Sequence, residues 1–132
     1  MIYRVYSFHR KFGLPLGETD KLIDDPDAQQ FRVKFIQEEL DELKEALNFK
    51  DKIATFDALL DLAYVVYGTA LFAGINPLQW YAGMDAVHKA NMDKVRVNNA
   101  DDSKRGSSFD VKKPDGWVSP ESKLKDILDD NY

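Results

Sequence analysis

The sequence predicts an all-α fold: an antiparallel bundle of four main helices plus a short C-terminal helix, completed by dimerisation. Apolar residues recur at helical spacing along the chain, and no segment shows the strict alternation of a half-buried strand. The link between the second and third helical segments is short, which favours antiparallel neighbours. Residues 58–73 are apolar nearly all round, so their surface needs more cover than one small chain provides.

Sequence signals mark the ends of these helices. Gly13 and Gly74 are the expected C-terminal stops of the first and third helices. Asp25 and Asn76 are the expected N-caps of the second and fourth. The expected helices are residues 2–12, 26–48, 52–73, 77 to about 95, and a short one that begins at 119–121.

The C-terminal third differs from the rest of the chain in charge and in residue composition. We expect one domain over residues 1–132 with a flexible basic loop at about 96–116, because this stretch lacks helical periodicity and is rich in Asn, Asp, Ser and Gly. A loop of this length is usually a lid or disordered, and the sequence leaves both open. Seven basic against four acidic residues lie from Lys89 to Lys113, in a chain of net charge −5. This balance argues against nucleic acid as a partner and suits a polyanion such as a phosphate chain.

Five acidic residues interrupt two helices that otherwise suit burial. They are Glu38, Glu39, Glu42, Asp57 and Asp61. The three glutamates share a row with Phe31 and Phe35, while Asp61 is the only charge in 58–73. The two groups lie about ten residues before and about eight residues after the link between the helices, so they should face each other.

Mutual repulsion limits what these acids can do unaided. Two carboxylates about 5 Å apart repel by roughly 3 kcal/mol at an effective dielectric of about 20. Either some of them take up protons with raised pKa values, or a hard divalent cation neutralises them. The near absence of Lys and Arg from these faces favours a metal, and all-oxygen ligation favours Mg²⁺, with Mn²⁺ possible. A solvated acidic face is the plain structural alternative.

The sequence also bears on location. The N-terminal residues carry charges throughout and contain no apolar signal region, so we expect a cytoplasmic protein. Residues 58–75 are about long enough to span a membrane. They contain Asp61, Gly68 and Gly74 and have no flanking basic residues, which favours a buried core helix and no membrane partner.

Several motifs together resemble the all-α nucleoside triphosphate pyrophosphohydrolases, which include MazG-type enzymes, phosphoribosyl-ATP pyrophosphohydrolases and dimeric dUTPases. The resemblance begins with EExxE at Glu38, Glu39 and Glu42, followed on the next helix by an acidic pair ending at Asp61. It extends to FHRKFG at 8–13, DLAYVVYGTA at 61–70, VHKANMDK at 87–94 and KPDGW at 113–117. In one departure, Ala58 stands where the family's ExxD pattern has Glu, and Asp57 is the expected substitute.

The resemblance implies Mg²⁺-dependent hydrolysis of a (d)NTP between the α and β phosphates, as in house-cleaning of dUTP or another pyrimidine or noncanonical dNTP. It implies a homodimer or a dimer of dimers. It makes the five acids metal ligands, with Glu38 or Glu39 also taking the proton of the attacking water. The implied substrate-binding residues are Phe8, His9, Phe12, Asn91, Lys94 and Lys113.

Two other functions stay open on the sequence. The first is a noncatalytic dimeric helical module whose acids bind a basic partner or a regulatory ion. The second is a metal-dependent phosphohydrolase that cleaves another bond. A panel of nucleotides assayed for pyrophosphate and phosphate would separate all three.

Overall fold

The structure, a computed structural model, describes residues 1–130 and confirms the all-helical class. Two compact units divide the chain, Met1–Trp80 and Tyr81–Tyr132. The helices are α1 (Ile2–Phe12), α2 (Pro26–Asn48), α3 (Lys52–Phe72), α4 (Pro77–Met92) and α5 (Glu121–Asp129). Between α4 and α5 lie β1 (Val95–Arg96), the 3-10 turn η1 (Ala100–Asp102) and β2 (Val111–Lys112).

The helix ends follow the sequence signals. Asp25 caps α2, because its carboxylate accepts hydrogen bonds from the backbone N–H groups of Asp27 and Ala28. Gly13 ends α1 in the left-handed conformation, at φ 66°. Before α4, the Asn76 side chain accepts from the Gln79 N–H, and the Gln79 side chain accepts from the Asn76 N–H. These reciprocal bonds form a capping box.

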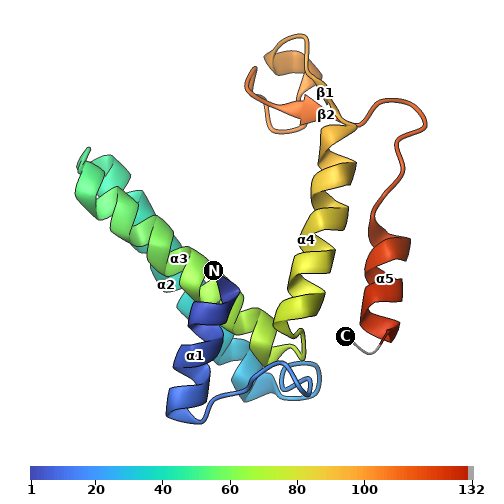
Figure 1. The fold of residues 1–132 in the computed structure, drawn as a ribbon. Helices are drawn as coiled ribbons and strands as arrows, with labels where there is room; N and C mark the ends of the chain where they lie inside the picture. Colours follow the sequence, from blue (N-terminus) through green and yellow to red (C-terminus); the bar gives the residue numbers. More distant parts are fainter. Residues whose placement is uncertain (131–132) are drawn as a thin grey trace. The chain divides into compact units, whose positions relative to one another are not determined.

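The first unit is built on a helical hairpin. Figure 1 shows α2 and α3 running antiparallel beside each other, with α1 against α3. Ile2 and Val5 of α1 meet Leu71 of α3 in the core, and Tyr67 and Trp80 pack around them. The core therefore lies at the end of the hairpin where α3 finishes, and the acidic positions of α2 and α3 lie further along it.

The second unit contains more regular structure than the sequence predicts. β1 and β2 pair antiparallel, with Val95 opposite Lys112 and Arg96 opposite Val111. Each strand has only two residues, so no alternation of side chains could reveal it. Asp102 and Lys112 form an ion pair at 2.7 Å across the segment between the strands. The expectation of no strand was therefore wrong for this segment.

α3 leaves much apolar surface uncovered in the single chain. Phe56 is 63% exposed, and Leu59 and Leu60 are about half exposed. By length and composition alone α3 could cross a membrane, which is weak evidence because core helices of soluble proteins pass the same test. The buried part of α3 includes Ala58, Val65 and Leu71. These residues leave an exposed apolar face on α3.

Candidate metal centre

The α2–α3 hairpin brings three of the five predicted acids together. One carboxylate oxygen from each of Glu39, Glu42 and Asp61 lies within 4.8 Å of the other two. Glu38 and Asp57 are not in this group. Both are electrostatically close, because Glu38 acts on Glu39 and Asp57 acts on Asp61. The pairing expected from the hairpin is therefore confirmed, with three acids at the centre and two beside it.

Glu39 has the most strongly shifted pKa in the group of three carboxylates. Its side chain is buried, and no partner within residues 1–130 forms a hydrogen bond with its Oε2 atom. Burial raises the pKa of Glu39 to about 7, and a hydrogen bond with Glu42 and the charges of Glu42, Asp61 and Glu38 add to the shift. A hydrogen bond between two carboxyl groups needs a shared proton. The cluster without a cation is therefore a proton-binding group near neutral pH.

Asp61 is shifted in the same direction. Burial raises its pKa, and the charges of Asp57 and Glu42 add to the effect. In both residues desolvation is the largest cause of the raised pKa, and neighbouring negative charges add to it. A positive charge placed among the carboxylates would therefore lower both pKa values.

The donor set suits a hard divalent cation. All its atoms are carboxylate oxygens, the ligands that Mg²⁺ and Mn²⁺ prefer. The unpartnered Oε2 of buried Glu39 is an acceptor without a donor, which a cation would satisfy. No Cys is present, and neither His9 nor His88 belongs to the group. The residues therefore fit Mg²⁺ or Mn²⁺ better than a soft metal.

A hollow of about 390 Å³ lies beside the cluster between α2 and α3. It is lined by Glu42, Asp57 and Ala58, together with Glu45 and residues at the tip of the hairpin. Ala58 occupies the position at which the sequence departs from the ExxD pattern, and its small side chain is 3% exposed. Asp57, the preceding residue, supplies a carboxylate to the α3 side of this hollow.

The predicted substrate-binding residues of α1 fall into two classes. Phe8 and Phe12 are about half exposed, and their rings lie 4.8 Å apart. His9 is 3% exposed, and its Nδ1 donates to the Pro15 carbonyl at 2.7 Å. Burial lowers the pKa of His9, and the charge of Arg32 lowers it further, although the Pro15 bond opposes this. His9 is therefore a buried residue and not a surface one.

The predicted cations of the second unit meet on one aromatic ring. The Nζ atoms of Lys94 and Lys113 lie 5.4 Å and 4.8 Å from the Trp117 ring centroid. The Trp117 indole N–H donates to the Ala90 carbonyl at 2.7 Å, which fixes the ring against α4. Asn91, next in the chain, is exposed. Two ammonium groups held on one indole form a small positive centre that suits an anion.

Sequence reasoning missed Arg32 and Trp117. Arg32 is a lone cation in the apolar row of α2, beside Phe31 and Phe35, and that position was its only signal. Arg32 is buried, at 4% exposure. The expectation that basic residues are nearly absent from these helix faces therefore has an exception at Arg32. Trp117 lies inside the KPDGW motif, but nothing in that motif indicates that Lys94 would share the ring.

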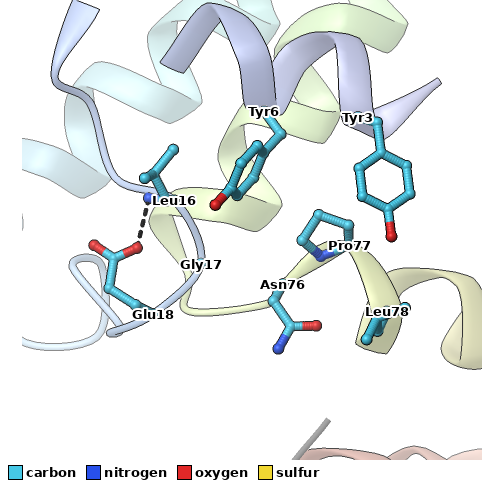
Figure 2. A pocket seen from close by; sticks show the side chains of 8 residues that line it. All are labelled: Tyr3, Tyr6, Leu16, Gly17, Glu18, Asn76, Pro77 and Leu78. Atoms are coloured by element: carbon cyan, nitrogen blue, oxygen red, sulfur yellow. Dashed lines mark hydrogen bonds between the residues drawn. The ribbon is translucent and has the colours of Figure 1, made fainter. Parts of the chain in front are cut away.

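A larger hollow lies elsewhere in the first unit and contains none of the predicted site residues. Its volume is about 560 Å³, and Tyr3, Tyr6 and Pro77 form part of its wall. Figure 2 shows Glu18 at its edge, where the carboxylate accepts a hydrogen bond from the Leu16 N–H at 2.8 Å. Its lining is mostly apolar, so it does not offer the ligands of the acidic centre.

Comparison with known protein families finds a match for most of the chain. The model of the family described as phosphoribosyl-ATP pyrophosphohydrolase matches residues 5–91. The chain belongs to the phosphoribosyl-ATP pyrophosphohydrolase family. The matched residues include all five acids, Phe8, His9, Phe12 and Asn91, but not Lys94 or Lys113.

A relative adds similarity without a described activity. An uncharacterized protein of Acanthamoeba polyphaga mimivirus is 33% identical over 97 residues, which cover 71% of this chain. The chain spans about 38% of the length of that relative. Family membership favours a pyrophosphohydrolase activity on nucleotides, and the acidic centre is the part of the chain that offers ligands for it.

Proposed function

We propose that the chain is a Mg²⁺-dependent nucleoside triphosphate pyrophosphohydrolase that converts a (d)NTP to the monophosphate and pyrophosphate. The observation that carries this proposal is the buried Glu39 with an unpartnered Oε2, facing Glu42 and Asp61 in a member of a pyrophosphohydrolase family. We further propose a cytoplasmic role in removing dUTP or another pyrimidine or noncanonical dNTP. That part rests on the sequence resemblance alone.

Glu39, Glu42 and Asp61 would hold the cation, with Asp57 as an additional ligand or an acceptor for bound water. Bound Mg²⁺ would supply charge neutralisation of the phosphates and polarisation at the α-phosphorus. Mn²⁺ has similar ligand preferences and is expected to substitute.

Glu38 is the favoured proton acceptor. It is exposed on α2 beside Glu39 and outside the three-carboxylate group, so its oxygens are not committed to the cation. In the proposed step, water oxygen bonds to the α-phosphorus, the bond from that phosphorus to the bridging oxygen breaks, and pyrophosphate leaves with the electron pair. The water proton goes to Glu38, or to Glu39 if that carboxylate is not fully used as a ligand.

Substrate contacts are proposed separately for each unit. The exposed rings of Phe8 and Phe12 offer apolar faces for a base or sugar. His9 is buried, so we propose that it supports the Phe8 side of α1 from beneath. Lys94 and Lys113 on Trp117, with Asn91, offer donors to phosphate oxygens.

A homodimer or a dimer of dimers is part of the proposal. Phe56, Leu59 and Leu60 of α3 form the apolar face that we expect a second copy to cover. The competing function is a noncatalytic dimeric module that binds a regulatory ion at the same acids.

The test is a panel of canonical and noncanonical dNTPs, with phosphoribosyl-ATP included because of the family description, assayed with Mg²⁺ in ¹⁸O-labelled water. We expect pyrophosphate as product and the label in the nucleoside monophosphate. Asp61→Asn is the inactive control, and Asp41→Asn, an exposed change on the same helix as Glu39, should leave the rate unchanged. Label in free phosphate would refute α-phosphorus attack, and no turnover of any nucleotide would favour the ion-binding module.

A further inference from the structure

Arg32 is a buried cation whose partners are not carboxylates. Its Nη2 donates to the Val65 carbonyl at 2.9 Å, and its Nε donates to the Thr69 hydroxyl at 3.1 Å. The ring of Phe72 lies 4.7 Å from the guanidinium carbon, and the rings of Phe31 and Phe35 lie 5.4 Å from it. Among the described residues, no acid forms an ion pair with Arg32. Burial of an unpaired charge is costly, so a role beyond plain packing should be sought.

Arg32 and Gly68 lie on the same two helices as the acidic centre, at an equal distance from it along each helix. Arg32 precedes Glu39 by seven residues on α2, and Gly68 follows Asp61 by seven residues on α3. Seven residues are about two turns, or about 10.5 Å. Because the helices run antiparallel, the Arg32–Gly68 layer and the Glu39–Asp61 layer belong to one interface.

Gly68 makes the arginine layer possible. A Cβ atom at this position would lie 2.8 Å from Arg32 Nη2 and 2.9 Å from His9 Nε2. Neither atom can move easily, because Arg32 is held by α3 and His9 by the Pro15 carbonyl. The glycine therefore admits both side chains against the backbone of α3.

The two acceptors of Arg32 come from residues one turn apart on α3, and the acceptor atoms are hydrogen-bonded to each other. The Thr69 hydroxyl donates to the Val65 carbonyl at 2.7 Å while it accepts from Arg32. A guanidinium presents its donors in a fixed planar fork, so two bonds to adjacent acceptors on α3 fix the position of Arg32 along that helix. We infer that Arg32 is a positioning residue that sets the register of α2 against α3 and so holds Glu39 and Glu42 opposite Asp61.

The two-turn separation fits this role. A cation next to the acids would pair with them and compete with a metal, whereas the interactions of Arg32 within residues 1–130 are with a carbonyl, a hydroxyl and aromatic rings. His9 adds no second donor at this point, because its Nδ1 carries the proton and the pKa of the ring is lowered. This inference rests on the proposed metal site, since it assigns Arg32 the task of assembling that site.

The test measures metal binding directly, by titration with Mn²⁺ followed by electron paramagnetic resonance, at a temperature where circular dichroism shows each variant folded. Arg32→Met should weaken Mn²⁺ binding about 10- to 100-fold, the range seen when a group that orients metal ligands is removed. Gly68→Ala keeps the arginine but displaces it, so it should weaken binding in the same direction. Thr69→Val removes one acceptor and should give a smaller loss.

Val5→Ala is the matched control, because Val5 is 2% exposed in the same unit and packs in the core with Ile2 and Leu71. It should lower the melting temperature and leave Mn²⁺ affinity unchanged. Variants of Arg32, Gly68 and Thr69 that lose stability but bind Mn²⁺ as the wild type does would overturn the positioning role. If Arg32→Met does not fold, Gly68→Ala and Thr69→Val decide by the same criterion. Wild-type protein that binds no Mn²⁺ would instead refute the metal site itself.

Discussion

Replacing Glu39 by Gln should stabilise the metal-free protein at pH 8 and remove its response to Mg²⁺. The pKa of Glu39 is raised from 4.5 to about 7 in the folded protein, first by burial and then by Glu42, Asp61 and Glu38. The folded state therefore binds a proton that the unfolded chain releases at lower pH. The contribution to stability is fully present below about pH 4.5, is lost as pH rises toward 7, and stays lost above it.

The size of the effect follows from the shift. The difference between 4.5 and about 7 sets an upper bound of about 3 kcal/mol on the destabilisation at pH 8. We discount this to about 1–2 kcal/mol, because Glu42 is exposed and solvent screens its charge. For a chain of this size that corresponds to a rise of about 3–6 °C in melting temperature.

The assay is thermal unfolding in EDTA and in Mg²⁺, at pH 5 and pH 8. We expect the Glu39→Gln variant to exceed the wild type in EDTA at pH 8, with a much smaller difference at pH 5. Mg²⁺ should stabilise the wild type by mass action and the variant little. Asp41→Asn, an exposed change on the same helix, controls for general loss of charge. A variant that is no more stable than the wild type in EDTA at pH 8 would refute the electrostatic argument.

The remaining predictions concern the ligand, the apolar face and a helix cap. Asp61→Ala should abolish both turnover and stabilisation by Mg²⁺, measured by pyrophosphate release and by melting; retained activity would contradict the ligand assignment. Phe56→Asp should shift self-association toward monomer in sedimentation, because it places a charge on the exposed face of α3; an unchanged sedimentation coefficient would locate the contact elsewhere. Asp25→Ala removes two capping bonds and should cost about 1 kcal/mol in chemical unfolding; unchanged stability would show that the cap is dispensable.

The acidic centre could be predicted because its determinants are local. The period of each helix aligns Glu39 with Glu42 and Asp57 with Asp61, and the short link between the helices sets their relative depth. The helix boundaries could be predicted for the same reason, since Asp25, Gly13 and Asn76 act on backbone groups close to them in the chain. Periodicity alone does not say which carboxylate is buried, and Glu38 and Glu39 are adjacent.

The parts that could not be predicted depend on long-range packing. Arg32 binds a carbonyl and a hydroxyl more than 30 residues away, and periodicity on α2 assigns it only to an apolar row. His9 lies on the side of α1 that is buried, and its cover comes from Phe72 and the Pro15 carbonyl rather than from sequence neighbours. The β1–β2 pair escapes detection because two residues cannot show an alternating pattern.

The hairpin contains two polar layers that bury charged groups of opposite sign. The Glu39–Asp61 layer destabilises the fold without a cation, because raised pKa values mean that the folded state disfavours the charged acids. The Arg32–Gly68 layer joins the same two helices through hydrogen bonds that involve no acid. If the acids alone set the register, their repulsion would drive the helices apart whenever the cation left, and the ligands would have to be reassembled each time. A separate anchor two turns away holds the carboxylates in place, so a cation meets a site that is already formed and its binding free energy is not spent on ordering the hairpin.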